Sequence, residues 1–465
     1  MAAAYKTPGV YIEEIPKFPP SIAPVETAIP AFIGYTQKAD GQVAADLRLK
    51  PTRIASMVEY ETRFGGPQPE TGVTVAVTGT KAVAALTEAT RSKHIMYYAL
   101  QLFFAAGGGP CHIVSVGGYK AAVGDALVET ELQAGLAALV KQEEPTLIVF
   151  PEAQNLAIAD CKALYDAALL QCAELKNRFV IMDAHGDNIS LADPSANLLT
   201  AIDNFRNNGV GANNLKYGAA YAPNLETVLD FSIDETKTSV AIDGGAAVML
   251  DTLQASSNRV YELAKAAIRD MPCKLPPAAA MAGVYAAVDN FRGVWKAPAN
   301  VSLNAVIQPA IPMSNKDQES LNVDATAGKS VNALRTFLGK GPLAWGARTL
   351  AGNDNEWRYV NVRRFFNFAE DSIKKATSQF VFEPNDANTW VKVQAMIENF
   401  LTTLWRQGAL QGVKPEHAFY VAVGLGKTMT PQDILEGRLI VEVGMAAVRP
   451  AEFIVLRFSH KMAES

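Results

Sequence analysis

The residues best placed to do chemistry form one short cluster: Asp183, His185 and Asp187. They follow the apolar run Phe179–Asp183, which is typical of a buried strand, and α/β folds bind ligands at the carboxyl ends of such strands. Two carboxylates and an imidazole at that point could bind a metal ion or carry out acid–base catalysis. The same residue types also build ordinary strand-to-helix loops, and the chain has only 5 histidines, with no second cluster to complete a ligand set. We keep an α/β enzyme acting through these three residues as the alternative hypothesis.

Two other stretches come close to a nucleotide-binding motif. Gly424–Thr428 and Ala327–Ser330 each contain a Gly-Lys pair followed by a hydroxyl residue. A P-loop also needs a glycine about five positions earlier, so that backbone N–H groups wrap the phosphate, but the sequence has Val421 and Val323 there. Neither stretch therefore fits a P-loop, and we interpret Gly424–Thr428 as a turn after a strand. The sequence also lacks G-x-S-x-G, H-E-x-x-H and G-x-G-x-x-G motifs, so we expect no cofactor, no metal and no enzyme activity.

The composition narrows the class of protein further. The 465 residues carry 42 Lys and Arg against 47 Asp and Glu, a formal net charge of −5, and 49% are hydrophobic while 19% are charged. High apolar content with a small net charge excludes a disordered chain. The lack of a positive excess excludes a basic nucleic-acid-binding protein. So low a charge density favours a surface that partners cover, because interface cores are depleted in charge.

Compartment follows from the N-terminal residues and the cysteines. The first residues contain neither the basic segment nor the apolar run of a signal peptide, and no stretch reaches the ~18–20 apolar residues of a membrane span. We expect cytoplasmic assembly without direct membrane insertion. The 4 cysteines are scattered, so we expect free thiols buried in the core: Cys111, Cys161, Cys172 and Cys273.

The body of the chain alternates helices with short, fully apolar strands. The expected strands are residues 31–35, 111–116, 146–150 and 179–183, and the expected helices between or after them are residues 95–106, 126–141, 156–176 and 194–207. This alternation predicts an α/β fold (α+β overall) whose outer domain has a mainly parallel sheet with helices on both faces.

Beyond residue 345 the pattern changes. We expect a strand at Val360–Val362, a helix at Phe365–Gln379 and a long helix from about Asn388, which Asp386 or Asn388 can cap and Gly408 can end. The long helix carries an apolar stripe at helical spacing: Val393, Ile397, Phe400, Leu401, Leu404 and Trp405. Two strands follow it, Phe419–Val423 and Arg438–Val443.

Both ends of the chain are predicted to be extended arms. Thr7–Ile15 is a β-prone run fenced by prolines, which keep a segment extended and out of a central strand. Ala451–Phe458 is a second apolar run, directly after Pro450. A strand without a hairpin partner adds either to the edge of its own domain or to another molecule's sheet.

An ordered series of short motifs resembles the contractile tail sheath proteins of phages and phage-tail-like injection systems. The series begins with Thr7–Glu14 and Val294–Asn300 and continues through Trp345–Leu350, Trp357–Arg364, Phe382–Asp386, Leu404–Leu410 and Arg449–Phe453. Each motif is weak alone, but their order along residues 1–35 and 283–465 is specific. Met445–Val448 departs from the pattern, because relatives more often have a proline before the valine.

The resemblance implies a structural subunit that stacks as rings, forming a helical homo-oligomer around an inner tube protein. Baseplate and tail-terminator or cap proteins are further implied partners, without nucleic acid. Such a sheath contracts and drives the tube through a target envelope. The resemblance also implies that arms of neighbouring subunits add strands to each other's C-terminal domains. The donated strands would contain Val10, Tyr11, Ile12, Glu13, Phe453, Ile454, Val455, Leu456 and Phe458, and the acceptor strands Phe419, Val421, Val423, Leu439, Val441 and Val443.

The expected domain organisation follows from the arms and the motif series. Residues 1–30 form the N-terminal arm and residues 31–282 a variable α/β outer domain, with a small β-rich insertion near residues 40–95. Residues 283–450 form the conserved α+β inner sheath domain, and residues 451–465 the C-terminal arm.

Overall fold

The computed structural model describes residues 21–86, 90–121, 125–184 and 194–457. The chain divides into two compact units. The larger unit contains Val25–Asp371 and Arg449–Ser465, and the smaller one contains Met1–Pro24 and Ser372–Val448.

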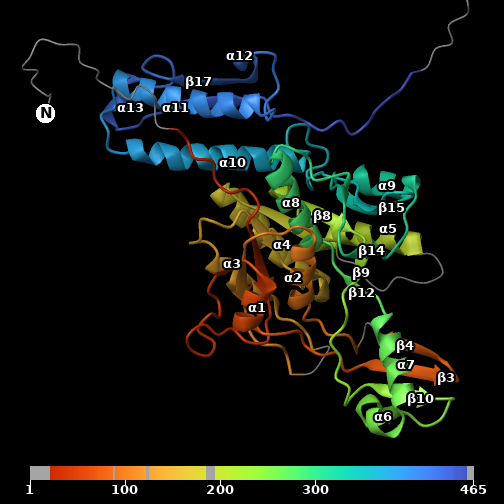
Figure 1. Cartoon of the computed structure of the whole chain (residues 1–465). Helices are drawn as coiled ribbons and strands as arrows, with labels where there is room; N and C mark the ends of the chain where they lie inside the picture. Colours follow the sequence, from red (N-terminus) through yellow and green to blue (C-terminus); the bar gives the residue numbers. More distant parts are fainter. Residues whose placement is uncertain (1–20, 87–89, 122–124, 185–193, 458–465) are drawn as a thin grey trace, which may run out of the picture. The chain divides into compact units, whose positions relative to one another are not determined.

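A nine-stranded sheet forms the centre of the larger unit (Figure 1). Its strands, in spatial order, are β13 (Val301–Ser302), β16 (Gly341–Ala344), β15 (Val331–Phe337), β8 (Gly218–Ala222), β7 (Phe179–Asp183), β6 (Leu147–Val149), β1 (Pro30–Gly34), β5 (Cys111–Ser115) and β2 (Thr52–Ile54). All neighbours from β15 to β5 pair in parallel, and the strands outside them pair antiparallel. The mainly parallel sheet expected from the sequence is confirmed.

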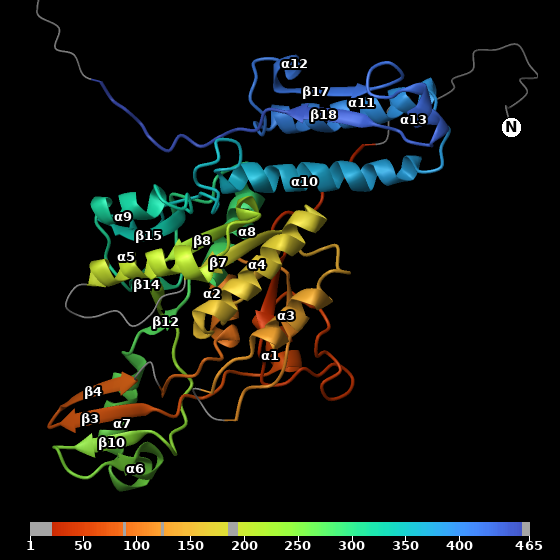
Figure 2. The same cartoon turned by 180° about the vertical axis from the view of Figure 1, so that it is seen from behind.

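Helices cover both faces of this sheet, as the all-apolar strands require. One face packs against α2 (Met96–Ala105) and α8 (Ala278–Arg292), and the other against α3 (Glu129–Ala138), α4 (Ile158–Leu175) and α5 (Pro194–Asn204). The latter three lie in front of the sheet in Figure 2. Successive residues of β1 point to opposite faces of the sheet. Phe32 packs in the core with α2 and α8, and Ile33 in the core with α3, α4 and α5.

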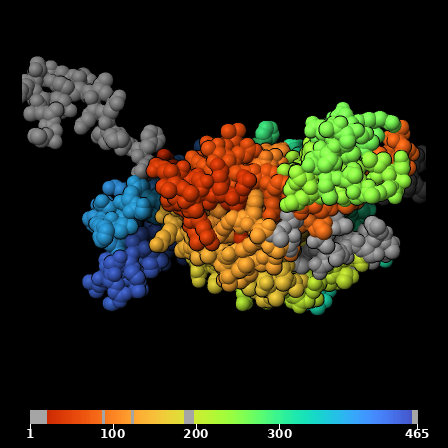
Figure 3. All heavy atoms as spheres, turned by 90° about the horizontal axis from the view of Figure 1, so that it is seen from below, coloured from red at the N-terminus to blue at the C-terminus, as the bar shows by residue number. Residues whose placement is uncertain are grey.

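Smaller sheets complete the larger unit. The strands β3 (Val73–Thr78), β4 (Lys81–Leu86), β10 (Ser239–Ile242) and β11 (Val248–Met249) form a four-stranded sheet, which packs with α6 (Leu250–Ser256) and α7 (Asn258–Arg269). Figure 3 shows the green atoms of the segment that contains β10, β11, α6 and α7 beside orange atoms from the first hundred residues, the part of the chain that contains β3 and β4. A three-stranded sheet joins β12 (Cys273–Leu275), β9 (Leu225–Thr227) and β14 (Val306–Pro309). The helices α1 (Met57–Phe64) and α9 (Asn315–Asn322) also belong to this unit.

Helix α10 (Val360–Thr377) begins in the larger unit and ends in the smaller one. The strand expected at Val360–Val362 is therefore wrong. A run of three residues is too short for its period to separate a strand from a helix, and the bond from Arg363 N–H to the Tyr359 carbonyl, at 3.2 Å, already belongs to the helical ladder.

The smaller unit contains one long helix and a two-stranded ribbon. Its elements after α10 are α11 (Ala387–Arg406), α12 (Pro415–Ala418), β17 (Phe419–Val423), α13 (Pro431–Leu435) and β18 (Val441–Met445). The long helix and the strand at Phe419–Val423 are confirmed. The second strand begins at Val441 rather than at Arg438.

Candidate inter-subunit interface

The β17–β18 ribbon is an antiparallel pair in register from Phe419 opposite Met445 to Val423 opposite Val441. Within the described part of the chain these two strands form a sheet of their own. Each strand therefore has one edge whose N–H and C=O groups no third strand occupies in that part of the chain. Free edges of this kind are templates for adding another strand.

One face of the ribbon is held by α11. The stripe predicted on this helix is buried except at Trp405, which is half-buried, and Val393, Ile397 and Leu401 are at most 1% exposed. Val421 and Val423 of β17 are 8% and 4% exposed, and β17 contacts the helix. The Asp386 side chain caps the helix by accepting the Thr389 N–H at 3.0 Å. The ribbon is thus supported by a helix whose position the sequence specifies locally.

The opposite face carries a tyrosine laid across a glycine. Tyr420 is 54% exposed, and its hydroxyl donates to the Glu442 carboxylate at 2.6 Å. This bond to a carboxylate raises the pKa of Tyr420. A Cβ on Gly444 would lie 2.1 Å from Cε1 of the Tyr420 ring, so the ring occupies the place of a side chain on β18. An aromatic ring over a glycine helps to fix the register of a strand pair.

The expected acceptor positions fall on this ribbon with one exception. Phe419, Val421 and Val423 lie in β17, and Val441 and Val443 lie in β18, whereas Leu439 precedes β18. The structure thus brings five positions of the acceptor set into one strand pair. Whether they accept strands from neighbours stays a prediction.

The donor positions are divided between described and undescribed residues. Val10, Tyr11, Ile12, Glu13 and Phe458 lie outside the residues that the structure describes. Phe453, Ile454, Val455 and Leu456 have no assigned secondary structure and are 73%, 79%, 76% and 72% exposed. Four consecutive apolar side chains held in solvent are unusual for a free protein and indicate a surface that binds another one.

The base of this C-terminal segment is fixed by an ion pair that sequence analysis did not identify. Arg348 Nε donates to Glu452 Oε1 at 2.8 Å and Arg348 Nη2 to Glu452 Oε2 at 2.5 Å. Both residues fall within motifs of the resemblance, but their 104-residue separation hides the pairing. Beside the pair lies a cavity of about 550 Å³, which Trp345, Tyr359 and Phe453 help to line.

Asp183, the first residue of the cluster considered for catalysis, is bound within the fold. Asp183 is 1% exposed, and its Oδ1 accepts the Ala278 N–H, the first amide of α8, at 2.6 Å. Burial raises the pKa of Asp183 to about 8. A carboxyl group enclosed in this way has no access to an external substrate. His185 and Asp187 lie outside the described residues.

The two P-loop-like stretches use their polar groups internally. In Gly424–Thr428 the Gly424 carbonyl accepts the N–H of Thr428 at 3.0 Å, which makes the stretch a turn as expected. The buried Lys329 ammonium donates to the carbonyls of Arg206 and Val210. Neither stretch therefore presents its lysine and amides together to a phosphate.

The cysteines and the acidic side chains are the other groups that could bind a metal ion. The four thiols are free and buried, as expected, and burial raises the pKa of Cys161 and Cys172 to about 12. Over the described ranges, no group of three His, Cys, Asp or Glu side chains is arranged to hold a metal ion. Nor, over the same ranges, does any helix combine the length and the apolar character of a membrane span.

Comparison with known proteins finds the same architecture in subunits of contractile particles. The family of the phage tail sheath C-terminal domain matches residues 352–461. A chain of the anti-feeding prophage (AFP) baseplate is 32% identical, over 99% of this chain and 100% of that one, with a TM-score of 0.66. A chain of the contracted AFP helical sheath is 31% identical, over 98% and 100%, with a TM-score of 0.65. The contracted PVC sheath complex, from an extracellular contractile injection system, is 29% identical over 99% of both chains, with a TM-score of 0.66.

Curated tail sheath proteins of two phages also match over shorter regions. The protein of Vibrio phage KVP40 is 23% identical over 185 residues, and that of Enterobacteria phage T4 is 28% identical over 164 residues. These regions span 26% and 22% of the two phage proteins.

The fold and the matches along the whole chain define a structural protein of contractile assemblies. The chain belongs to the contractile tail sheath family.

Proposed function

We propose that this chain is the repeating subunit of a contractile sheath, which polymerises around an inner tube and shortens to drive that tube through a target envelope. One observation carries the proposal: a single chain holds both an open two-stranded ribbon and an exposed, unpaired apolar segment. Donor and acceptor on one molecule make a polymer that extends by repeating one joint.

The joint is β-augmentation. The N-terminal arm of one subunit and the C-terminal arm of another add to the two free edges of β17–β18 in a third subunit, giving a four-stranded sheet. Packing on α11 stabilises the two-stranded ribbon before any arm arrives. Each added strand then pairs the backbone N–H and C=O groups that the ribbon leaves open at its edges.

The free energies involved favour arm binding that is weak for a single arm and strong when both arms of a subunit are bound in the polymer. Each backbone hydrogen bond contributes a net ~0.5–1.5 kcal/mol, and each apolar side chain of residues 453–456 that becomes fully buried contributes about 1.5–3 kcal/mol. Ordering the segment costs roughly 1–2 kcal/mol per residue. For these four residues the gains exceed the ordering cost, and the roughly 4–15 kcal/mol that association costs in translational and rotational freedom offsets the rest. Two arms per subunit then act together through their high effective concentration.

The domain arrangement belongs to the same proposal. The smaller unit and the arms join neighbouring subunits on the inside of the sheath, next to the tube, and the α/β body lies outside. The match of residues 352–461 to the sheath C-terminal domain family supports this assignment. Inner tube, baseplate and terminator proteins are the proposed partners, and the particle assembles in the cytoplasm.

The proposal is tested by Leu456→Asp, with Leu338→Asp as the matched control. Both leucines are exposed, at 72% and 105%, but only Leu456 lies in the donated strand. We expect purified wild type and Leu338→Asp to form hollow cylinders in negative-stain microscopy, and Leu456→Asp to remain a folded monomer with an unchanged circular dichroism spectrum. Cylinders of normal length from Leu456→Asp would contradict strand donation by the C-terminal arm.

A further inference from the structure

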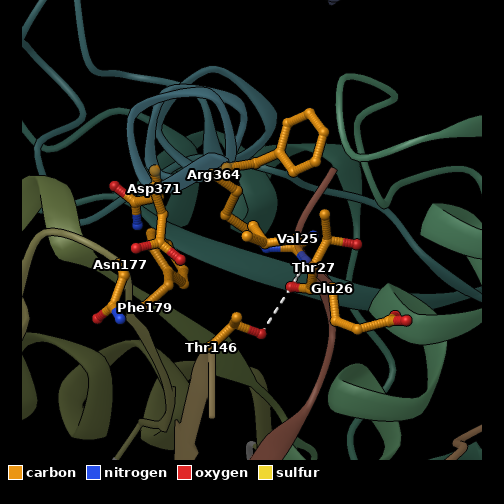
Figure 4. A pocket seen from close by; sticks show the side chains of 10 residues that line it. Val25, Glu26, Thr27, Thr146, Asn177, Phe179, Arg364 and Asp371 are labelled. Carbon is orange, nitrogen blue, oxygen red and sulfur yellow. Dashed lines mark hydrogen bonds between the residues drawn. The ribbon is translucent and has the colours of Figure 1, made fainter. Parts of the chain in front are cut away.

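The chain preceding β1 is fixed by two hydrogen bonds to one carbonyl group. The Thr27 carbonyl accepts from Arg364 Nη2 at 2.9 Å and from Thr146 Oγ1 at 2.8 Å. Thr146 Oγ1 also accepts the Ile29 N–H at 3.0 Å. Figure 4 shows the side chains of Arg364, from α10, and of Thr146, just before β6, converging on this stretch. Residues 25–29, the root of the predicted N-terminal arm, are thus held before the sheet begins.

The arginine in this contact is itself fixed by a buried carboxylate. Arg364 of α10 and Asp289 of α8 have side chains only 3% and 2% exposed, and the fork of two bonds between them measures 3.0 and 2.5 Å. The guanidinium also lies over the Tyr285 ring, 4.7 Å from its centroid. A buried arginine needs such pairing to offset its desolvation, and the second N–H of Nη2 is then presented to Thr27 in one direction.

The C-terminal arm leaves the larger unit beside a second arginine. Arg348 holds both oxygens of Glu452, as described above, and its Nη1 donates to the Asn322 carbonyl at 3.1 Å. The Tyr359 hydroxyl reaches Glu452 at 3.3 Å. The exposed apolar residues begin at Phe453, directly after the paired carboxylate.

We propose that Arg364 and Arg348 are positioning residues that set the direction in which the two arms leave the body. The inference rests on the proposed function and adds to it the groups that aim the donated strands. A planar guanidinium bonded to two carboxylate oxygens fixes orientation as well as distance. Fixing the root of a flexible segment also lowers the entropy that is lost when its far end binds. Both arginines lie within residues 345–364, so one short stretch of chain orients both arms.

The two roots differ in solvent access. The side chains of Arg364 and Asp289 are enclosed, whereas Glu452 is 22% exposed against 5% for Arg348. Salt screens the exposed pair more than the enclosed one. Rising ionic strength therefore loosens the C-terminal arm before the N-terminal one.

The C-terminal root is tested with Glu452→Gln, which removes the charge and preserves the shape. Glu356→Gln is the matched control, because Glu356 is exposed in the same unit. Spin labels at Leu456→Cys and at Lys340→Cys report the direction of the arm by electron–electron distance measurement, since the native cysteines are buried. We expect a narrow distance distribution in wild type and Glu356→Gln, a broad one in Glu452→Gln, and cylinder elongation slowed about tenfold in Glu452→Gln. The thermal midpoint of Glu452→Gln should fall as well, because Arg348 loses its partner.

A Glu452→Gln distribution as narrow as that of wild type would overturn the proposal for this arm. The outcome is separable from the proposed function: if wild type forms no cylinders, the sheath proposal fails, while the distance measurement on the monomer still tests the anchor.

The N-terminal root is tested with Arg364→Lys, which retains the charge beside Asp289 but lacks the fork that also reaches Thr27. We expect amide exchange at Ile29 to accelerate at least about tenfold, while β7 keeps its protection. If amide exchange accelerates equally at Ile29 and in β7, or at neither, Arg364 does not position the root of the N-terminal arm. Should Arg364→Lys fail to fold, Arg364→Met with Asp289→Leu removes both charges together, and the same comparison applies.

Discussion

At the scale of single residues, buried polar side chains hold the structure of this chain in place. Asp183 bonds to the first amide of α8, and Arg364 and Arg348 bond to the roots of the two arms. Asp183 is recognised as a candidate from the sequence because it ends an apolar strand. Its hydrogen-bond partner Ala278 lies 95 residues further along the chain, so its structural role could not be predicted. Sequence reasoning missed the arginine pairs for the same reason: Asp289 and Arg364 are 75 residues apart, and burial of a charge cannot be read from local pattern.

Asp183 predicts a pH dependence of stability. Its pKa is about 8 in the folded chain, against a model-peptide value of 3.8. Between these pH values the folded chain binds one more proton than the unfolded chain, so the free energy of unfolding falls as the pH rises. Asp183→Asn retains an oxygen for the Ala278 N–H and cannot ionise. Its stability relative to wild type should therefore grow from pH 5 to pH 8, by up to about 1.4 kcal/mol per pH unit.

The measurement is urea unfolding of wild type and Asp183→Asn at several pH values, with Glu356→Gln as an exposed carboxylate control. The control curve should run parallel to that of wild type. If the curves of Asp183→Asn and wild type also run parallel between pH 5 and pH 8, Asp183 is ionised in the folded chain and its assignment as a neutral, buried acceptor is wrong.

At the scale of elements, prediction succeeded where the signal was local. The stripe of α11, its Asp386 cap and the positive φ of 83° at Gly408 all follow from residues within a few positions of each other. The strand expected at Val360–Val362 failed because so short a run fits the first turn of α10 equally well. The four-stranded sheet could not be foreseen from periodicity, because it pairs β3 with β10, more than a hundred residues further along the chain.

The ribbon offers a prediction at this scale. Alanine at Gly444 would place its Cβ 2.1 Å from the Tyr420 ring, so Gly444→Ala must displace the ring or distort the register. We expect a loss of up to about 1 kcal/mol in the unfolding of the smaller unit, the size of one cross-strand contact, because the exposed ring can swing aside. Tyr420→Ala removes the obstacle, and the double variant should lose less than the two single changes added together.

A double-mutant cycle in urea decides the point, and microscopy of the same variants shows whether ribbon geometry matters for assembly. We expect Gly444→Ala to form few cylinders and the double variant to recover part of them. Strict additivity of the two changes would mean that the ring does not cover Gly444 in solution.

At the scale of the whole molecule, the compact units and the expected domains divide the chain differently. The sequence places the start of the C-terminal domain near residue 283, where the motif series resumes, whereas the smaller unit begins its main segment at Ser372. The strands β13, β15 and β16, all beyond residue 300, complete the edge of the nine-stranded sheet. Motifs follow the family's signatures, whereas compact units follow the contacts that bury apolar surface. The arms cross this division, since Arg449 returns the chain to the larger unit after β18.

Assembly through donated strands predicts inhibition by a free arm. A peptide of residues 449–460, extended by two lysines for solubility, should add to the open edge of β18 or β17 and terminate growth there. The free peptide is not linked to a subunit, so it lacks the millimolar effective concentration that a tethered arm has. It also lacks Arg348, which would orient the residues around Glu452. Inhibition should therefore be weak, with cylinder length halved at roughly 0.1–1 mM peptide, and it should vanish for the same peptide carrying aspartate at the Leu456 position. Cylinders of unchanged length at saturating peptide, with binding to the monomer demonstrated by fluorescence anisotropy, would show that growth does not proceed through this edge.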